Sequence, residues 1–201
     1  EPAIFSLQLL DTFVSILILK KRMGFPIHLK IDTGMNRLGI KPSEISNFID
    51  ILNSQPELHL KGVYSHFAES DNQLDASFTD HQLNVFKDSC ATLRKHISYP
   101  FIKHIANSAA IISHSKASLD MVRMGLIVYG INHNLKMKKK LYPVIEWLSE
   151  VTQIKHLNKG DTVGYNREFL VKKEMTIAIV PVGYADGFRR SLGNGKGTVF
   201  I

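Results

Sequence analysis

The sequence has a single cysteine, Cys90, among its 201 residues, so it contains no internal disulfide framework. Such sparse use of cysteine fits a reducing compartment, and we expect a cytoplasmic protein. The sequence also has no stretch of about 18 consecutive apolar residues, the length that a membrane-spanning helix requires. The longest candidate, residues 13–19, ends at Lys20, Lys21 and Arg22. We therefore expect no association with a membrane.

Neither end of the sequence has the features of a natural terminus. The first residue is Glu1 rather than methionine, and the sequence stops at Ile201 directly after an apolar run. We expect both ends to be cut from a longer protein, so the lack of a signal peptide says little about targeting.

Acidic residues are outnumbered, with 18 Asp and Glu against 25 Lys and Arg and a net charge of +7. The basic clusters are residues 136–140 (KMKKK) and the pair Arg189 and Arg190. A basic interaction module would rest on this charge alone. No aromatic residues lie among the lysines to stack on bases, so we expect solvated loops and no nucleic-acid partner.

The sequence is 44% hydrophobic and 21% charged, which is ordinary for a soluble globular protein. From residue 26 to about residue 130, short apolar runs alternate with helix-like segments. We predict strands at residues 26–31, 58–66, 101–105 and 121–131. This pattern indicates βα units that build a parallel sheet, either a (β/α) barrel or a doubly wound sheet, and periodicity does not choose between them.

Three helices are predicted between these strands. Ser43 caps the first, whose apolar residues recur at helical spacing. Thr79 and Gln82 form a T-x-x-Q capping box ahead of the second. Its apolar stripe comprises Leu83, Phe86, Cys90 and Leu93. The third is a short helix at residues 107–114.

Beyond residue 140 the pattern changes to strands without intervening helices. The predicted strands are residues 144–154, 161–165 and 175–182, separated by turns rich in Asn, Gly and Asp. We therefore predict a first domain over residues 1–140 and a separate β-domain over residues 141–201, with the boundary near residue 140.

The most informative stretch is residues 30–39, KIDTGMNRLG, which begins at the carboxyl end of a predicted strand. In a barrel, active sites lie at that end of the strands. From the residues alone, Asp32 and Arg37 could equally form a structural pair that braces a loop.

This stretch resembles the signature of alanine racemases, and further blocks that match the family follow in the same order. They are residues 62–68 (GVYSHFA), 106–110 (ANSAA), 122–125 with 129–130 (VRMG and YG), 163–165 (VGY) and 181–187 (PVGYADG). The sequence looks most like racemases of the Bacteroidetes type, in which the module can be fused behind a muramyl-peptide ligase. The resemblance implies an α/β fold: the C-terminal part of a (β/α)8 TIM-type barrel followed by the start of a β-strand domain.

The resemblance also implies an activity, interconversion of L-alanine and D-alanine with pyridoxal 5'-phosphate, which supplies D-alanine for peptidoglycan. Its active sites would be composite sites of a homodimer. The family's Schiff-base lysine lies in a V-K-A-N-A-Y-G-type motif on the first barrel strand, and these residues contain no such motif. The final segment of the β-domain is missing too, so the catalytic machinery in these residues is incomplete.

The barrel residues acquire expected roles from the resemblance. Arg123 matches the arginine that donates to the pyridine nitrogen of the cofactor, although a structural salt bridge is the plainer alternative. Arg37 matches a contact to the phenolic oxygen of the cofactor, near the substrate carboxylate. Lys30 matches a lysine that is carbamylated in many members, which would orient Arg37, and otherwise would be a surface lysine. His66 matches the histidine that packs against the cofactor ring.

The phosphate and the second catalytic base are assigned in the same way. Ser108, with Asn107 and the backbone of Gly125 and Leu126, matches the phosphate contacts, although Asn107 and Ser108 could otherwise only cap a helix. The remaining two residues lie in the β-domain. Tyr165 matches the catalytic tyrosine that reaches into the partner's barrel, and Tyr184 matches a residue of the substrate entry path.

Two other functions remain open at this stage. One is a different pyridoxal-phosphate enzyme of the same fold type, such as a racemase for serine or another amino acid, or a decarboxylase. The other is a non-catalytic pyridoxal-phosphate carrier, which would be a barrel without a β-domain, whereas this sequence continues through residues 163–165.

Overall fold

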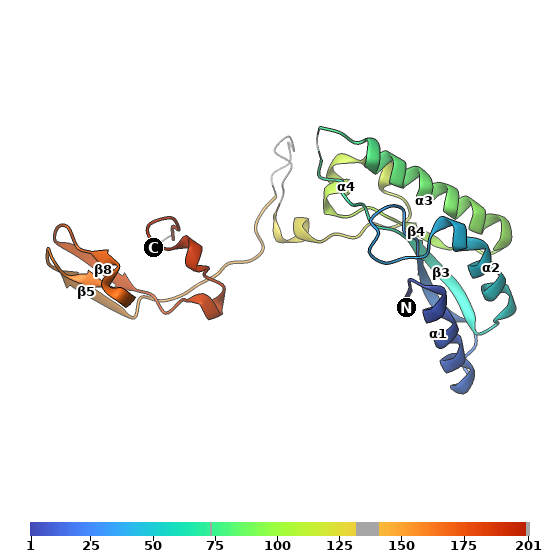
Figure 1. Cartoon of the computed structure of the whole chain (residues 1–201), viewed down its shortest axis with the longest axis horizontal. Helices are drawn as coiled ribbons and strands as arrows, with labels where there is room; N and C mark the ends of the chain where they lie inside the picture. Colours follow the sequence, from blue (N-terminus) through green and yellow to red (C-terminus); the bar gives the residue numbers. More distant parts are fainter. Residues whose placement is uncertain (73, 132–140, 200–201) are drawn as a thin grey trace. The chain divides into compact units, whose positions relative to one another are not determined.

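The computed structural model describes residues 1–72, 74–131 and 141–199, and the chain forms two compact units, Glu1–Val144 and Ile145–Ile201. The predicted domain boundary near residue 140 and the basic run at residues 136–140 lie outside the described residues. Each unit has its own secondary structure (Figure 1).

The first unit is built on a parallel sheet with the strand order β1-β2-β3-β4. Its strands are β1 (Ala3–Ile4), β2 (Phe25–Lys30), β3 (Leu58–Tyr64) and β4 (Ile102–His104). The three long helices are α1 (Leu7–Leu19), α2 (Ile45–Ser54) and α3 (Ser77–His96). Since strands that are consecutive in the chain are also neighbours in the sheet, and a helix connects each pair, the unit is a series of βα units. This confirms the predicted α/β class.

The core lies between the sheet and these helices. In β2, Ile27 and Leu29 are fully buried on the helix side, while the alternate residues His28 and Lys30 point to the opposite face. The apolar stripe predicted for α3 supplies the other half of the core, and all four of its residues are buried. Burial of each large apolar side chain stabilises the fold by about 1.5–3 kcal/mol, which favours the apolar face of the sheet packing against the helices. Because side chains alternate along a strand, the polar strand residues then lie on the face away from the helices.

Several predicted elements are confirmed. Strands β2, β3 and β4 fall within the segments 26–31, 58–66 and 101–105, apart from one residue at the start of β2. The first predicted helix is α2, which begins two residues after Ser43, directly after the 3-10 turn η1 (Pro42–Glu44). The short helix predicted after β4 is α4 (Ser108–Ser113). Elements β1 and α1 were not predicted.

The capping box predicted at Thr79 and Gln82 is wrong. Helix α3 begins two residues earlier, at Ser77, so Thr79 lies inside its first turn, and its hydroxyl is buried without a hydrogen-bond partner among the described residues. Gln82 is fully buried and accepts a hydrogen bond from the backbone amide of Ala68 instead of capping the helix. The local capping rule assigned the Gln82 side chain to the helix end, but a tertiary hydrogen bond and burial in the core place it elsewhere.

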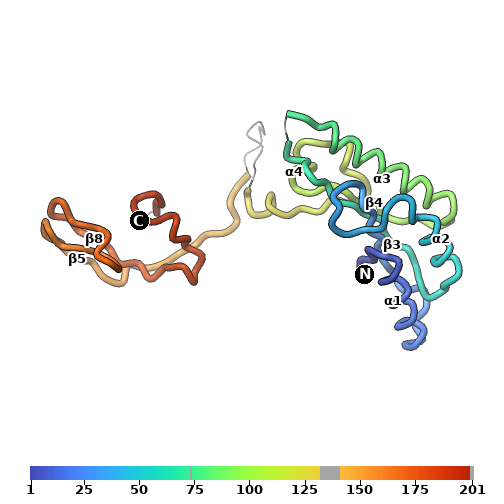
Figure 2. Tube along the Cα trace, in the orientation of Figure 1, coloured from blue at the N-terminus to red at the C-terminus, as the bar shows by residue number. Residues whose placement is uncertain are grey.

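The strand predicted at residues 121–131 is also wrong. Residues 121–124 are irregular, and the apolar run forms the 3-10 helix η3 (Leu126–Tyr129). Its backbone bonds are local, from Val128 N–H to Gly125 O at 3.0 Å and from Gly130 N–H to Ile127 O at 3.1 Å. Gly130 ends the turn in the left-handed region at φ 79°. Figure 2 allows the chain to be followed from β4 through α4 to this segment.

The second unit consists of short antiparallel pairs, β5 (Gln153–Leu157) with β8 (Met175–Ile179) and β6 (Thr162–Val163) with β7 (Phe169–Leu170). The strand predicted at 175–182 is confirmed over its first five residues. The strand predicted at 144–154 is wrong over most of its length, because β5 includes only its last two residues. The strand predicted at 161–165 ends at Val163, because Gly164 turns the chain at φ 82° into the 3-10 turn η4 (Tyr165–Arg167).

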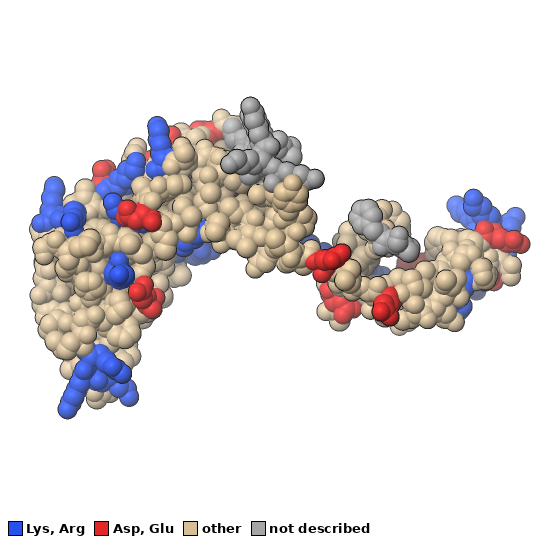
Figure 3. Space-filling view, turned by 180° about the vertical axis from the view of Figure 1, so that it is seen from behind, with Lys and Arg blue, Asp and Glu red and all other residues tan. Residues whose placement is uncertain are grey.

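Among the helices of the described residues, none is long and apolar enough to cross a membrane. On the face drawn in Figure 3, Lys and Arg side chains gather in several separate groups rather than in one continuous patch.

Candidate active site

The carboxyl ends of β2, β3 and β4 bring together polar residues that are far apart in the sequence. Lys30 is the last residue of β2, Tyr64 is the last residue of β3, and His104 is the last residue of β4. The Tyr64 and His104 rings stack with their centroids 5.1 Å apart. The carboxyl ends of parallel strands lie at one edge of a sheet, which is where the active site of a barrel is expected.

Arg123 lies at the centre of this group and is held by neutral acceptors. Its Nη1 donates to His104 Nδ1 at 2.6 Å and to His104 O at 3.2 Å. Its Nη2 donates to Ser65 O at 2.6 Å and to His66 Nδ1 at 3.3 Å. Its Cζ lies 5.1 Å from the centroid of the Tyr64 ring, a cation–π contact. These contacts fix the guanidinium plane without neutralising its charge.

The electrostatic field of the site is positive. Burial lowers the pKa of Lys30, and the nearby charges of Arg37 and Arg123 lower it further. Burial also lowers the pKa of His66, as do Arg123, Lys30 and Arg37. Burial, Arg123 and His28 lower the pKa of His104 to about 4. Both histidines are thus neutral at pH 7, and the cluster of cations suits an anionic ligand.

The loop after β2 is organised by Asp32 through the backbone. Asp32 Oδ1 accepts hydrogen bonds from Gly34 N and Asn36 N, both at 3.0 Å. A side chain at Gly39 could not be accommodated, because its Cβ would lie 2.6 Å from Asp32 N and the residue has φ 129°. Arg37 is exposed on this loop, close enough that its charge lowers the pKa of Lys30. Asp32 therefore braces the loop through backbone amides.

The residues expected around the phosphate line one cavity with Arg123 and His66. The cavity has a volume of about 360 Å³, and its lining includes Asn107, Ser108, Gly125 and Leu126. Ser108 Oγ accepts a hydrogen bond from Gly125 N at 2.8 Å, which leaves the hydroxyl proton free to donate elsewhere. Asn107 Oδ1 caps α4 by accepting from Ala110 N at 3.0 Å.

Two of the expected site residues, Tyr165 and Tyr184, belong to the second unit. Their side chains are 96% and 72% exposed. Tyr165 begins a turn of unusual backbone geometry, since Gly164, Asn166 and Arg167 all have positive φ. Such conformations concentrate at functional sites because the surrounding structure must hold them in place.

Sequence reasoning missed three residues that the structure places around Arg123: Tyr64, His104 and His28. Tyr64 lies inside the block at residues 62–68, and His104 lies inside a predicted strand, where it pairs with Tyr64 of the neighbouring strand. Nothing local in the sequence indicates His28, which reaches the site through its contact with His104.

Comparison with known proteins identifies the family. Residues 1–133 match the family model described as alanine racemase, N-terminal domain, and residues 144–201 match alanine racemase, C-terminal domain. An alanine racemase from Treponema denticola is 40% identical over 174 residues, which are 85% of this chain and 46% of that protein. One from Clostridium tetani is 36% identical over 205 residues, covering 100% of this chain and 52% of that protein. The chain thus spans about half the length of the curated relatives it matches.

Solved structures show the same relationship. Alanine racemase from Bacillus anthracis with bound L-Ala-P superimposes with a TM-score of 0.82 at 32% identity, over 94% of this chain and 50% of that chain. Alanine racemase from Bartonella henselae with covalently bound pyridoxal phosphate superimposes with a TM-score of 0.72 at 27% identity, over 95% of this chain and 51% of that chain. The predicted architecture, part of a barrel followed by part of a β-domain, is confirmed by these neighbours. The chain belongs to the alanine racemase family.

Proposed function

We propose that this protein is a pyridoxal-phosphate-dependent alanine racemase that interconverts L-alanine and D-alanine. The observation that carries this proposal is the anchoring of Arg123, which keeps its charge while its two Nη atoms are bound to neutral acceptors beside the cavity. The D-alanine would serve peptidoglycan synthesis, and the enzyme would act in the cytoplasm as a homodimer.

The residues around the cavity fit the cofactor. Ser108 Oγ and the backbone of Gly125 lie together at one side, where Gly125 N–H donates to Ser108 Oγ at 2.8 Å. These groups and the backbone of Leu126 would hold the phosphate, with Asn107 behind them as the cap of α4. The hydrogen bonds of Arg123 to the described residues use its two Nη atoms, and its Nε–H would be the donor to a ring nitrogen.

Pyridoxal phosphate, when bound, withdraws electrons from the α-carbon of an amino acid. Arg123 would donate to the ring nitrogen and leave it unprotonated, because a guanidinium has donors and no acceptor and keeps its proton, even though burial lowers the pKa of Arg123. A weaker electron sink favours rapid return of a proton to the α-carbon, as racemisation requires. His66, bound to Arg123 through Nδ1, would pack against the ring.

Lys30 and Arg37 would bind the substrate side of the cofactor. Arg37 would contact the phenolic oxygen and lie near the substrate carboxylate, where its forked donors fit. Lys30 is buried, and its lowered pKa raises the fraction of neutral amine. Attack of that amine on carbon dioxide would form a carbamate and release one proton to solvent. The resulting anion would replace the repulsion between Lys30 and Arg37 by attraction.

Tyr165 would move the proton on one face of the α-carbon, and the Schiff-base lysine of the upstream barrel strand would serve the other face. An almost fully exposed phenol on a strained turn suits a residue that completes a site in the partner subunit. Tyr184, also exposed, would line the path by which alanine enters.

The test uses the full-length native protein. Purified with pyridoxal phosphate, it should absorb in the visible, lose that band on reduction with borohydride, and convert either alanine enantiomer into a mixture of both. Serine and other amino acids, with assays for racemisation and for release of carbon dioxide, distinguish the related racemases and decarboxylases. A protein that binds the cofactor but turns over no amino acid would support the carrier function and contradict the proposal.

A further inference from the structure

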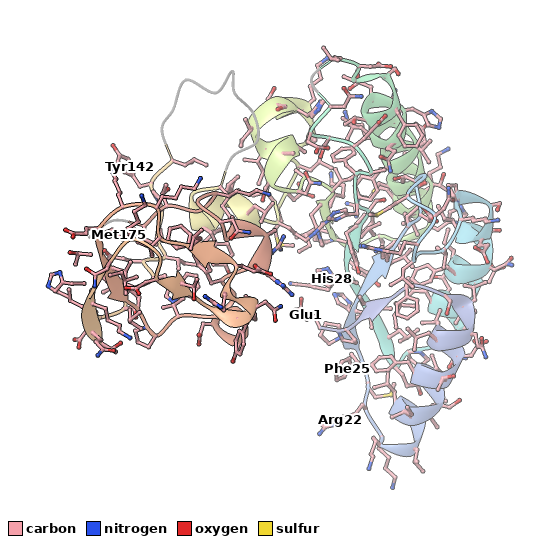
Figure 4. All side chains as sticks on the ribbon, turned by 60° about the vertical axis from the view of Figure 1, so that its left-hand side comes forward. Glu1, Arg22, Phe25, His28, Tyr142 and Met175 are labelled. Carbon is pink, nitrogen blue, oxygen red and sulfur yellow. The ribbon has the colours of Figure 1, made fainter. Side chains whose placement is uncertain are left out.

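Behind Arg123, on the same face of the sheet, the structure contains a chain of three side chains that no expected role includes. His104 Nε2 lies 3.0 Å from His28 Nδ1, and His28 Nε2 lies 2.9 Å from Glu1 Oε2. Figure 4 labels Glu1 and His28, which lie next to each other on the first unit. His28 and His104 are 76 residues apart in the sequence.

The direction of every hydrogen bond in this chain follows from one fact, that a guanidinium has donors and no acceptor. Because Arg123 Nη1 donates to His104 Nδ1, that nitrogen carries no proton, and the neutral His104 ring must be protonated on Nε2. His104 Nε2–H then donates to His28 Nδ1. The neutral His28 ring is in turn protonated on Nε2, which donates to the Glu1 carboxylate.

Space for this arrangement is provided by Gly62 on β3. A Cβ at this position would lie 2.5 Å from both Cε1 and Nδ1 of the His28 ring and 3.0 Å from Ile102 Cγ1. The backbone of Gly62 is not in the left-handed region, so the reason for glycine here is the closeness of the His28 ring. The ring therefore occupies a position that only glycine on the neighbouring strand leaves open.

A second proton on either histidine ring would break this series of hydrogen bonds. A doubly protonated His28 would place its Nδ1–H against His104 Nε2–H, and a doubly protonated His104 would place its Nδ1–H against Arg123. The groups that face His104 are Arg123, His28 and the Tyr64 ring, and those that face His28 are His104 and Glu1. Among the described residues, the Glu1 carboxylate at the far end is the acceptor that His28 Nε2–H meets.

We propose that Glu1 and His28 are positioning residues that fix His104 in its Nε2–H tautomer and thereby hold Arg123 with its Nε–H free for a ligand in the cavity. This relay, the series of hydrogen bonds from Arg123 through His104 and His28 to Glu1, is a property of the folded polypeptide itself. Its consequence for catalysis rests on the proposed function, in which that ligand is the pyridine ring of the cofactor.

The direct test is the tautomer of His104 in the full-length native protein, read from the nitrogen chemical shifts of its ring by NMR. The wild-type protein should show the Nε2–H tautomer. His28→Leu removes the acceptor and should shift His104 toward a mixture of tautomers. His28→Gln offers an amide oxygen in place of Nδ1 and should keep the wild-type tautomer. This readout requires neither bound cofactor nor activity.

The kinetic test compares the same variants in the cofactor-loaded enzyme. Misplacement of a positioned group by about 1 Å can reduce a rate by up to about 100-fold. We expect His28→Leu and Gly62→Ala to lower kcat about 10-fold with little change in KM, and Glu1→Ala to have a smaller effect. His28→Gln should recover most of the loss. The matched control is His59→Leu on β3, which removes a histidine that stacks on Tyr99 instead.

The outcomes separate the two proposals. An Nδ1–H tautomer of His104 in the wild-type protein overturns the relay, even if the protein racemises alanine. An Nε2–H tautomer that His28→Leu abolishes and His28→Gln retains supports the relay, even if no racemase activity is found. Equal losses of kcat in His28→Leu and His28→Gln, with the tautomer unchanged in both, would show that His28 has only a packing role.

Discussion

Gln82 of α3 donates from Nε2 to Thr33 Oγ1 at 3.2 Å, although 49 residues separate them in the sequence. The same Nε2 donates to His66 O at 3.2 Å, and Thr33 Oγ1 lies 2.8 Å from Ser65 Oγ. One fully buried amide thus links the helix layer to the ends of β2 and β3. It supports the backbone from which His66 extends toward Arg123.

Replacement of Gln82 should therefore destabilise the first unit. Gln82→Leu keeps the volume but leaves the Ala68 N–H, the His66 carbonyl and the buried Thr33 hydroxyl without this partner. Leaving a buried polar group unsatisfied costs about 1–3 kcal/mol. We expect a lower midpoint of thermal or denaturant unfolding, measured on the cofactor-free full-length protein. Asn84→Leu, at an exposed position of the same helix, is the control and should shift the midpoint little.

The predicted and observed roles of Gln82 show which features of the fold the sequence can predict. Its spacing from Thr79 satisfies a capping rule, yet tertiary burial uses the side chain elsewhere. By contrast, the buried strand residues and the stripe of α3 follow from periodicity, because alternation and helical spacing are set by backbone geometry. The contact between His28 and His104 depends on the pairing of strands through β3, and no local pattern encodes it. The strand predicted after Met121 is wrong for a different reason. The apolar run there forms a 3-10 helix, because local hydrogen bonds at Gly125 and Gly130 close its turns.

A second prediction concerns pH. The folded protein lowers the pKa of His104 to about 4, and it also lowers the pKa of His66, whereas histidine in an unfolded chain titrates near 6.5. The unfolded state therefore takes up protons first as the pH falls. The contribution of these histidines to the free energy of unfolding should be fully present above about pH 6.5 and should be lost progressively as the pH falls from there toward 4. Unfolding midpoints measured across this range provide the test.

His104→Gln makes the pH test specific. The amide oxygen can accept from Arg123 and the amide nitrogen can donate to His28, but the group does not titrate. Its unfolding midpoint should depend less on pH between 6.5 and 4 than that of the wild-type protein. The same pH slope in both proteins would assign the dependence to other groups.

A third prediction concerns Lys30. If the amine is carbamylated, Lys30→Ala should lower kcat/KM, and a small carboxylate such as acetate should restore part of the loss by occupying the vacated space beside Arg37. Removal of dissolved carbon dioxide should reduce the activity of the wild-type enzyme and leave the variant unaffected. Lys41→Ala, at an exposed lysine beyond the loop, is the matched control. Full activity of Lys30→Ala would contradict the role.

The last prediction tests Tyr165. Tyr165→Phe removes one hydroxyl from a side chain that is 96% exposed, so the fold and the absorption of the bound cofactor should remain unchanged. Loss of a positioned base lowers a rate by about 10²–10⁴-fold, and racemisation should fall by that order.

Exchange of the α-proton in deuterated solvent distinguishes a base from a binding group. If Tyr165 serves only one face of the α-carbon, Tyr165→Phe should lose exchange from L-alanine far more than exchange from D-alanine, because the lysine on the opposite face remains. Equal losses would mean that the tyrosine positions the substrate. Hybrid dimers of Tyr165→Phe subunits with subunits that lack the Schiff-base lysine then locate the residue. If each tyrosine completes the partner's site, one of the two sites in a hybrid keeps both bases and activity returns. No recovery in hybrids of verified composition would place Tyr165 in the site of its own subunit.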